Sequence, residues 1–296
     1  MTSRVWRDVT VVIPTTGGEV LHGCLSSIAA GTTWPQELIV VDQGQHDDVA
    51  AWIANLRAGG LNARHLPSSQ RGIAAATNRG LEQVRTPYVA VTHDDCRVRS
   101  DWLTRLAARL PEVGDAVLTG RVEPAGDGIV LTVKTADEPA VYRAPLLDGD
   151  VLFPPNMAFP IRLLQRVGAF DEHRSLLTAG EDNDWAYRAL SAGIPMVYDP
   201  SVTVGHLARF TRSDLLALYR RYARGQGAFY GKYLRRGDGF IARRALRDLL
   251  RAPWLLLRGL ATANVELIAM GTGEVTGLPR GILAGLRNDG RWSRRS

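Results

Sequence analysis

The sequence predicts an α/β fold with a mostly parallel sheet flanked by helices, and three observations lead to this prediction. Two apolar runs, 9–14 and 37–42, have the length and the Val and Ile content of buried strands. A segment with apolar residues at helical spacing, 21–30, lies between these runs. Further strand and helix signals alternate through the first half of the chain, which is typical of a parallel sheet whose faces are covered by helices.

The remaining elements follow in order along the chain. After the second strand we expect a helix over 48–58, a strand over 63–66, a helix over 73–84, a strand over 88–95 and a helix over 101–110. A strand-like segment over 116–124 and a less regular region over 125–155 come next. The acidic stretch 180–184 begins an amphipathic helix that stops near Gly193, and a strand-like segment over 195–206 follows it.

The distribution of charge divides the chain into two parts. Residues 207–296 contain 18 Lys and Arg against 6 Asp and Glu, a net charge of +12, whereas residues 1–206 contain 18 against 24, a net charge of −6. Such an asymmetry indicates that the two parts face different partners. We therefore predict an α/β domain over 1–206 and a basic helical region over 207–296.

One helix of the basic region has an amphipathic pattern. Over 240–259 we expect Ile241, Ala245 and Leu246 on one face and Arg243 and Arg247 on the other, and no run is long enough to cross a bilayer. The pattern fits a helix that lies in a membrane interface, with its arginines among anionic lipid phosphates. It fits equally a helix that packs on the domain with a solvated arginine face, and both interpretations stay open.

Composition and cysteine content exclude several classes of protein. With 45% apolar and 22% charged residues, the chain has the composition of a globular protein, which excludes disorder. Its two cysteines, Cys24 and Cys96, are too few for a disulfide framework or a cysteine metal cluster, and no signal peptide is recognisable, so we predict a cytoplasmic location. The basic tail suggests a nucleic-acid-binding protein as an alternative, but it contains no recognisable nucleic-acid motif.

Polar side chains follow the predicted strands of the sheet. Pro14 and Asp42 end the first two strands, and Asp94 and Asp95 end the strand over 88–95. Ligands bind at the carboxyl ends of strands in open α/β sheets. Two adjacent carboxylates in this position suit Mg²⁺ or Mn²⁺, with phosphates and water as the other ligands, and a turn with solvated aspartates is the alternative.

The stretch GEDND carries three acids in four positions at the start of a predicted helix. Capping of the helix N-terminus explains such acids, and a positioned carboxylate that removes a proton from a substrate explains them as well. Repulsion from Glu181 would raise the pKa of Asp182, whereas the helix N-terminus would lower it. The outcome of this competition stays open at the level of the sequence, and Asp184 is expected to be structural.

Six segments in this order resemble a family 2 glycosyltransferase of the GT-A fold. They are VVIPTTGGEVLHGCLSSI, ELIVVDQG, QRGIAAATNRGL, VAVTHDDCRV, NMAFPIRLLQRVGAFDE and AGEDNDWAYRALSAG. The resemblance covers about residues 8–206. It implies a nucleotide-sugar donor, a divalent metal, Mg²⁺ or Mn²⁺, and direct transfer with inversion at the anomeric carbon.

The resemblance also implies roles for individual residues. Donor binding falls to Pro14, Thr15, Asp42, Arg71 and Asp94, and metal binding falls to Asp95 and His206. Asp182 matches the catalytic base with Glu181 beside it, and Asn156 and Trp185 lie on the acceptor side. The residues alone leave other interpretations open, namely a strand-end histidine bonded to the backbone for His206, a core residue for Trp185, and turn or loop residues for Thr15, Asp42, Arg71 and Asn156.

Two positions depart from the family's pattern. His93 stands where relatives often carry an aspartate, which puts the ribose contacts and the metal preference in doubt. Pro160 stands where a basic residue is more usual, which puts the acceptor-side loop in doubt.

The predicted function is transfer of a sugar from a nucleotide-diphosphate donor to a hydroxyl of a lipid-linked or polysaccharide acceptor, at the inner face of the cytoplasmic membrane. A sugar nucleotidyltransferase is one alternative, but that class usually carries a Gly-rich loop with Arg and Lys after its first strand, and IPTTGGEVL has neither cation. A catalytically inactive relative is another, and the presence of both Asp95 and Asp182 argues against it.

Overall fold

A computed structural model of the chain describes residues 5–129, 133–144, 154–172, 179–207 and 210–287. The chain forms two compact units, Met1–Phe170 with Trp185–Ala208, and Asp171–Asp184 with Arg209–Ser296. The second unit therefore contains, besides the basic region, the acidic stretch that the sequence assigned to the α/β domain. The helix that begins at Glu181 starts in the second unit and continues in the first.

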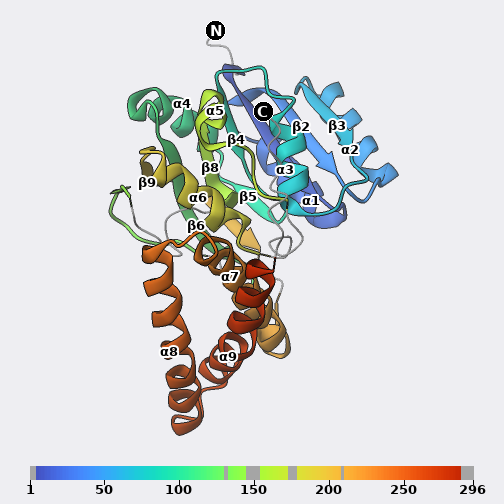
Figure 1. Ribbon diagram of the computed structural model, residues 1–296. Coiled ribbons are helices and arrows are strands. Elements are labelled where there is room, and N and C mark those ends of the chain that lie inside the picture. The colour runs from blue at the N-terminus through green and yellow to red at the C-terminus, as the bar shows by residue number, and fades with distance from the viewer. Residues whose placement is uncertain (1–4, 130–132, 145–153, 173–178, 208–209, 288–296) are drawn as a thin grey trace. The chain divides into compact units, whose positions relative to one another are not determined.

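The first unit is built on a nine-stranded sheet in the described residues, with the order β3-β2-β1-β4-β8-β6-β9-β5 and β7 paired to β9 (Figure 1). The strands are β1 Val5–Thr15, β2 Trp34–Asp42, β3 Ala63–Pro67, β4 Tyr88–Val91, β5 Cys96–Val98, β6 Val117–Ala125, β7 Ala140–Tyr142, β8 Met157–Pro160 and β9 Met196–Leu207. From β3 to β4 all neighbours are parallel, as predicted. Beyond β4 the sheet is mixed, because β8, β5 and β7 run antiparallel to their neighbours.

Helices cover both faces of this sheet, which explains the uninterrupted apolar runs of its strands. The helices are α1 Glu19–Ala29, α2 Asp47–Ala58, α3 Ile73–Leu81, α4 Trp102–Val113, α5 Leu164–Val167 and α6 Glu181–Ser191. Side chains alternate along a strand, so Val11 and Ile13 of β1 join a core with α1, α2 and α4, whereas Val12 joins the core with α3 and α6.

The strand predicted over 88–95 is shorter in the structure. It ends at Val91, and β5 begins at Cys96. The residues between them form a turn, which contains both Asp94 and Asp95. The two carboxylates therefore lie in a loop at the carboxyl end of β4 rather than within the strand.

The second unit contains three long helices, α7 Leu215–Leu234, α8 Gly239–Ala261 and α9 Val265–Leu286 (Figure 1, orange to red). Glycines let the backbones of α7 and α9 approach closely. A Cβ on Gly281 would lie 2.1 Å from the carbonyl oxygen of Arg224, and one on Gly231 would lie 2.3 Å from that of Ile282. No larger residue fits at these two positions without separating the helices.

The predicted faces of the amphipathic helix need a correction. Ile241 and Ala245 of α8 are buried, whereas Leu246 and Leu250 are 58% and 69% exposed. The sequence pattern had placed Leu246 on the same face as Ile241 and Ala245, because the positions of the neighbouring helices are not visible in it. Pro253 does not end the helix, which continues to Ala261. Among the described residues, no helix is both long and apolar enough to cross a bilayer.

Candidate active site

Thr15 and Asp94, which are 79 residues apart, meet at the carboxyl ends of two adjacent strands. The Thr15 hydroxyl donates a hydrogen bond to Asp94 Oδ2 at 2.7 Å, and the amide of Gly17 donates to the same hydroxyl at 2.8 Å. The reason is the parallel pairing of β1 with β4, which brings their ends to one edge of the sheet. Pro14 precedes Thr15 in β1 and is buried.

Asp42 lies at the end of β2, fully buried, and organises the loop that follows. Its Oδ1 accepts hydrogen bonds from the amides of Gly44 and Gln45 at 2.8 and 3.1 Å, and its Oδ2 accepts one from the amide of His46 at 2.9 Å. Oδ2 also lies 3.1 Å from Nε2 of His65. The carboxylate of Asp42 is therefore engaged within the protein, in the manner of a turn residue that fixes the backbone after a strand.

Arg71 is exposed in the loop before α3. This loop is tied to the end of β2 by Gln43, whose side chain accepts a hydrogen bond from the amide of Gly72 at 2.7 Å and donates one to its carbonyl oxygen at 3.2 Å. Sequence reasoning did not single out Gln43. The loop after β2 and the loop before α3 are thus joined through one amide side chain.

Asp95 and His206 lie side by side. Cys96 of β5 pairs with His206 of β9, so Asp95, one residue earlier, comes within reach of the histidine. The distance from His206 Nε2 to Asp95 Oδ2 is 3.3 Å. Because the amide of Leu207 also donates to the carbonyl oxygen of Asp95 at 2.9 Å, both side chains are held at the same corner of the sheet.

The pair suits a divalent cation that is shared with a ligand. A carboxylate oxygen suits Mg²⁺ and Mn²⁺, and an imidazole nitrogen suits Mn²⁺ better. Among the described residues, no group of three or more His, Cys, Asp and Glu side chains is arranged to hold a metal. Asp95 and His206 therefore fit a metal only if oxygens of a bound ligand, such as a diphosphate, supply further donors.

The acidic turn at the start of α6 has raised pKa values. Burial, with repulsion from Asp182 as a smaller cause, raises the pKa of Glu181 to about 8. Burial also raises the pKa of Asp182, although backbone hydrogen bonds, including one from the amide of Asn183 at 2.7 Å, act in the opposite direction. The competition that the sequence left open is thus decided by burial, and both acids hold their protons more strongly than usual.

Helix α7 holds this acidic turn from within the second unit. Nζ of Lys232 lies 2.8 Å from Asp171 Oδ2 and also donates a hydrogen bond to Asp184 Oδ1. The hydroxyl of Tyr233 donates to the same Asp184 oxygen at 2.9 Å. Asp184 has no exposed surface. The negative charge of Asp184 is therefore balanced by the buried Lys232. Tyr233, the next residue in α7, binds the same carboxylate.

A second set of contacts joins α7 to the same turn. The side-chain amide of Asn183 donates to Oε1 of Gln226 at 2.6 Å. A Cβ on Gly225 would lie 2.1 Å from the carbonyl oxygen of Ala179, so α7 passes directly against the backbone that leads into the turn. The segment that carries Glu181 and Asp182 therefore packs against α7, a helix of the basic region.

Sequence reasoning missed Lys232 and Tyr233, although the chain contained a signal for the lysine. Lys134 and Lys232 are the only two lysines among 36 basic residues. Both are buried, with 8% and 4% of their surface exposed. The rarity of lysine in an arginine-rich chain points to positions where a compact ammonium group is required.

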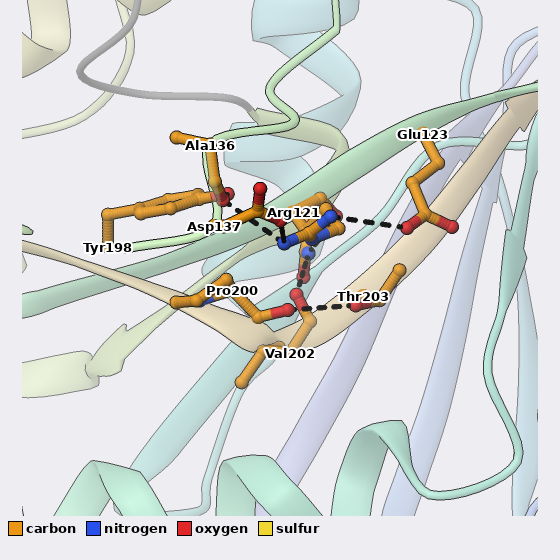
Figure 2. Close-up of polar contacts among 9 residues, drawn as sticks. Arg121, Glu123, Ala136, Asp137, Tyr198, Pro200, Val202 and Thr203 are labelled. Carbon is orange, nitrogen blue, oxygen red and sulfur yellow. Dashed lines mark hydrogen bonds and ion pairs between the residues drawn. The ribbon is translucent and has the colours of Figure 1, made fainter. Parts of the chain in front are cut away.

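Asn156 lies in the core and uses its polar atoms there. Its Oδ1 accepts from Nε1 of Trp102 at 2.9 Å, and its Nδ2 donates to the carbonyl oxygens of Arg121 and Val202, each at 2.9 Å. Figure 2 shows the neighbouring polar contacts, in which Thr203 donates to the carbonyl oxygen of Pro200. With 1% of its surface exposed, Asn156 bridges β6 and β9, so no acceptor contact is proposed for it.

Trp185 is also a core residue. It has no exposed surface and lies between Phe159 and Phe170, with ring centroids 5.1 Å away in each case. Its indole N–H donates to the carbonyl oxygen of Gly168 at 3.0 Å. The predicted place on the acceptor side is corrected accordingly, because a fully covered ring offers no surface to an acceptor.

Comparison with known families assigns the chain. Residues 10–164 match the sequence profile of the family described as glycosyl transferase family 2, and this match spans more than half of the chain. The chain belongs to glycosyltransferase family 2. The family predicted from the six motifs is thereby confirmed.

A curated protein is similar to this family 2 glycosyltransferase over most of the chain. It is 28% identical over 297 residues to the pre-mycofactocin glycosyltransferase of Mycobacterium tuberculosis, an alignment that covers 95% of this chain and 57% of that protein. The chain thus spans little more than half the length of that curated relative.

Two solved structures are similar in fold. S. aureus TarS 1–349 in complex with UDP-GlcNAc matches with a TM-score of 0.59 and 16% identity, over 90% of each chain. GalNAc-T7 with UDP, GalNAc and Mn²⁺ matches with a TM-score of 0.53 and 17% identity, over 68% of this chain and 43% of that one. Both neighbours have the GT-A fold, which confirms the predicted fold class of this family 2 glycosyltransferase.

Proposed function

We propose that this family 2 glycosyltransferase transfers a sugar from a nucleotide-diphosphate donor to a hydroxyl of an acceptor, with inversion at the anomeric carbon. The observation that carries the proposal is the pairing of Thr15 with Asp94 and of Asp95 with His206 at the carboxyl edge of the sheet. The similar TarS structure contains UDP-GlcNAc, which supports a nucleotide-sugar donor at such an edge. Pro14, Asp42 and Arg71 belong to the same donor side as strand-end and loop residues.

Asp95 and His206 are the residues that would hold a divalent metal. When bound, Mg²⁺ or Mn²⁺ would neutralise the negative charge that develops on the departing diphosphate. The Mn²⁺ in the similar GalNAc-T7 structure supports this assignment. Asp95 supplies a carboxylate oxygen and His206 an imidazole nitrogen, while Thr15 orients the neighbouring Asp94 through its hydrogen bond.

Asp182 is proposed as the general base. In a direct displacement the acceptor oxygen forms a bond to the anomeric carbon, the bond from that carbon to the diphosphate breaks, and the acceptor proton passes to a carboxylate. A raised pKa makes the Asp182 carboxylate a stronger proton acceptor than an ordinary aspartate. Glu181, with a pKa of about 8, holds its own proton at neutral pH, so it adds no second negative charge directly beside Asp182.

The acceptor is proposed to be a lipid-linked or polysaccharide hydroxyl at the inner face of the cytoplasmic membrane. The net charge of +12 over residues 207–296 supports contact with anionic lipids. The family assignment disfavours the alternatives of a sugar nucleotidyltransferase and a nucleic-acid-binding protein.

A donor panel tests the transfer. UDP, dTDP and GDP sugars are offered with Mg²⁺ or Mn²⁺ and candidate acceptors, and the release of nucleoside diphosphate is measured. We expect one nucleotide class to support release, and Asp182→Asn to lower kcat by about 10²- to 10⁴-fold. Asp137→Asn, at a side chain that is 87% exposed, serves as the control and should retain the wild-type rate.

Thermal stability gives an independent measurement. The matching diphosphate with metal should raise the Tm of the wild-type protein, and Asp95→Asn should remove the metal-dependent part of that rise. A protein that neither releases diphosphate from any activated sugar nor responds to metal and diphosphate would overturn the proposal.

A further inference from the structure

The large apolar side chains that are exposed on the chain gather on two helices. Nine of the ten such side chains among the described residues belong to α8 and α9, and the tenth is Val141 on β7. Exposed apolar residues scattered singly are normal on a protein surface, whereas a contiguous group indicates a surface that binds a partner.

On α8 these side chains form one strip. The strip consists of Leu246, Leu250, Trp254, Leu257 and Leu260, each more than half exposed. Their spacing of four, four, three and three residues places them on one face of the helix. The opposite face, which includes Ile241, Ala245, Ala252, Leu255 and Gly259, is buried. The strip therefore runs along the outer side of the helix from Leu246 to Leu260.

The helices of this unit contact one another through small residues. A Cβ on Gly271 of α9 would lie 2.4 Å from the backbone nitrogen of Leu256 in α8, and one on Gly259 of α8 would lie 2.7 Å from that of Ile268 in α9. Close packing through small residues is the pattern that helices use in lipid, where burial of large apolar side chains between helices gains little. The leucines of the strip, conversely, face outward, as lipid contact requires.

Arginines follow one edge of the strip. Arg243, Arg247, Arg251 and Arg258 are all exposed, and helical geometry places them beside the leucines rather than on the opposite side of α8. The guanidinium of Arg258 lies 5.2 Å from the ring centroid of Trp254. Asp248, the one acid within α8, is buried and bonded to Tyr230. Arg247 pairs with Asp248 at 3.2 Å and Arg251 pairs with Glu274 of α9 at 2.8 Å. Arg243 and Arg258 therefore carry the positive charge beside the apolar strip.

We propose that this outer side of α8 binds the surface of an anionic lipid bilayer. The leucines and Trp254 enter the boundary between headgroups and acyl chains, and the arginines lie at the level of the lipid phosphates. Because its exposed leucines and Trp254 lie along one side only, α8 lies in the plane of the membrane. This proposal rests on the proposed function, in which the enzyme reaches its acceptor at a membrane.

Vesicle binding of the full chain tests the surface. Phosphatidylcholine vesicles with and without 30% phosphatidylglycerol, about a third anionic as a test composition, are compared by flotation. We expect Leu250→Ser with Leu257→Ser to weaken binding to anionic vesicles at least about tenfold, since each removes buried apolar contact with lipid. Arg243→Gln with Arg258→Gln, at two exposed positions beside the strip, should reduce binding toward the level of neutral vesicles.

A matched control and a local probe complete the experiment. Val141→Ser changes a side chain that is 56% exposed outside the strip, and it should bind vesicles as the wild type does. Anionic vesicles should also shift the tryptophan emission of the wild type to shorter wavelength, and Trp254→Phe should abolish that shift. Circular dichroism of each variant confirms that the helices are retained.

Several outcomes would overturn the surface. Equal vesicle binding by the leucine variant and the wild type would show that the strip does not contact lipid. Equal binding to neutral and anionic vesicles would show that the arginines do not bind lipid phosphates. A change of the leucine variant from dimer to monomer without vesicle binding by the wild type would assign the strip to a second copy of the chain. If the protein transfers sugar to a soluble acceptor but does not bind vesicles, the proposed lipid-binding surface is wrong. The proposed transferase function would then still stand.

Discussion

At Asp182 the surroundings of one carboxylate decide when it can accept a proton. Its pKa lies above the ordinary value of 3.8, because burial disfavours the charged form. We expect kcat/KM for transfer to rise with pH as Asp182 loses its proton, with the acidic limb of the profile above the range of a solvated aspartate. Measurement of kcat/KM over a pH series with saturating metal locates this acidic limb. An acidic limb at or below pH 3.8 would contradict the assignment of Asp182 as a buried base.

Glu181 links the same turn to stability. Its pKa of about 8 in the folded protein exceeds its ordinary value of 4.5, so the folded state binds the proton more tightly. The stability that this proton contributes is complete below about pH 4.5 and is lost as pH rises toward about 8. Glu181→Gln should therefore unfold with a flatter pH dependence, by at most about 1.4 kcal/mol per pH unit.

Urea unfolding of both proteins across this pH range measures the difference. Glu138→Gln makes the same substitution at an exposed position and serves as the control. Parallel curves for the wild type and Glu181→Gln would show that Glu181 is not the group that holds the proton.

Asn156 illustrates how a predicted site residue proves to be a core residue. Asn156→Ala would leave the indole N–H of Trp102 and the carbonyl oxygens of Arg121 and Val202 without this partner. We expect a loss of about 3 kcal/mol in the free energy of unfolding, since buried polar groups without partners are costly. The exposed Asn62, which donates to the carbonyl oxygen of Gln36, gives the control, and Asn62→Ala should cost less than about 1 kcal/mol. Equal losses would contradict the structural role.

At the scale of elements, α7 is the support of the acidic turn. Lys232→Met would leave Asp171 and Asp184 buried without their cation, and removal of one partner from a buried pair typically costs about 3–5 kcal/mol. We expect lower stability by this amount and a fall in kcat, because the turn that carries Asp182 loses its anchor. Exposed Arg235→Met is the comparison, and it should be close to wild type in urea unfolding and in kcat. Similar stability and similar kcat in the two variants would show that Lys232 does not anchor the acidic turn.

The elements themselves were largely predictable, because their signals are local. The helix expected over 48–58 is α2, Asp47–Ala58, and the strand expected over 63–66 is β3, Ala63–Pro67. The position of Pro14, Asp42 and Asp94 after strands of one sheet was predicted, whereas the hydrogen bond from Thr15 to Asp94 is a finding of the structure. The core position of Trp185 was one of two interpretations that the sequence left open, and the outer side of α8 was not predictable. Both depend on which distant segment covers a face.

At the scale of the whole molecule, the chain divides at positions that composition does not reveal. The change of charge near residue 207 marks the start of the basic region, yet the acidic segment Asp171–Asp184 belongs to the same unit as that region. One of the contacts between them joins Lys232 to Asp171, 61 residues away, and a contact of this span leaves no local pattern. The motif that carries the proposed base therefore depends on a helix outside the family match, which ends at residue 164.

The burial of both lysines has a practical consequence for work on this protein. Lys134 and Lys232 are the only side-chain amines, and each is almost fully covered in the folded chain. Amine-reactive dyes and lysine cross-linkers should therefore react slowly with these side chains until the surrounding structure opens. The rate of acylation at Lys232, followed by mass spectrometry, would then report directly on how often the unit that contains the acidic turn unfolds.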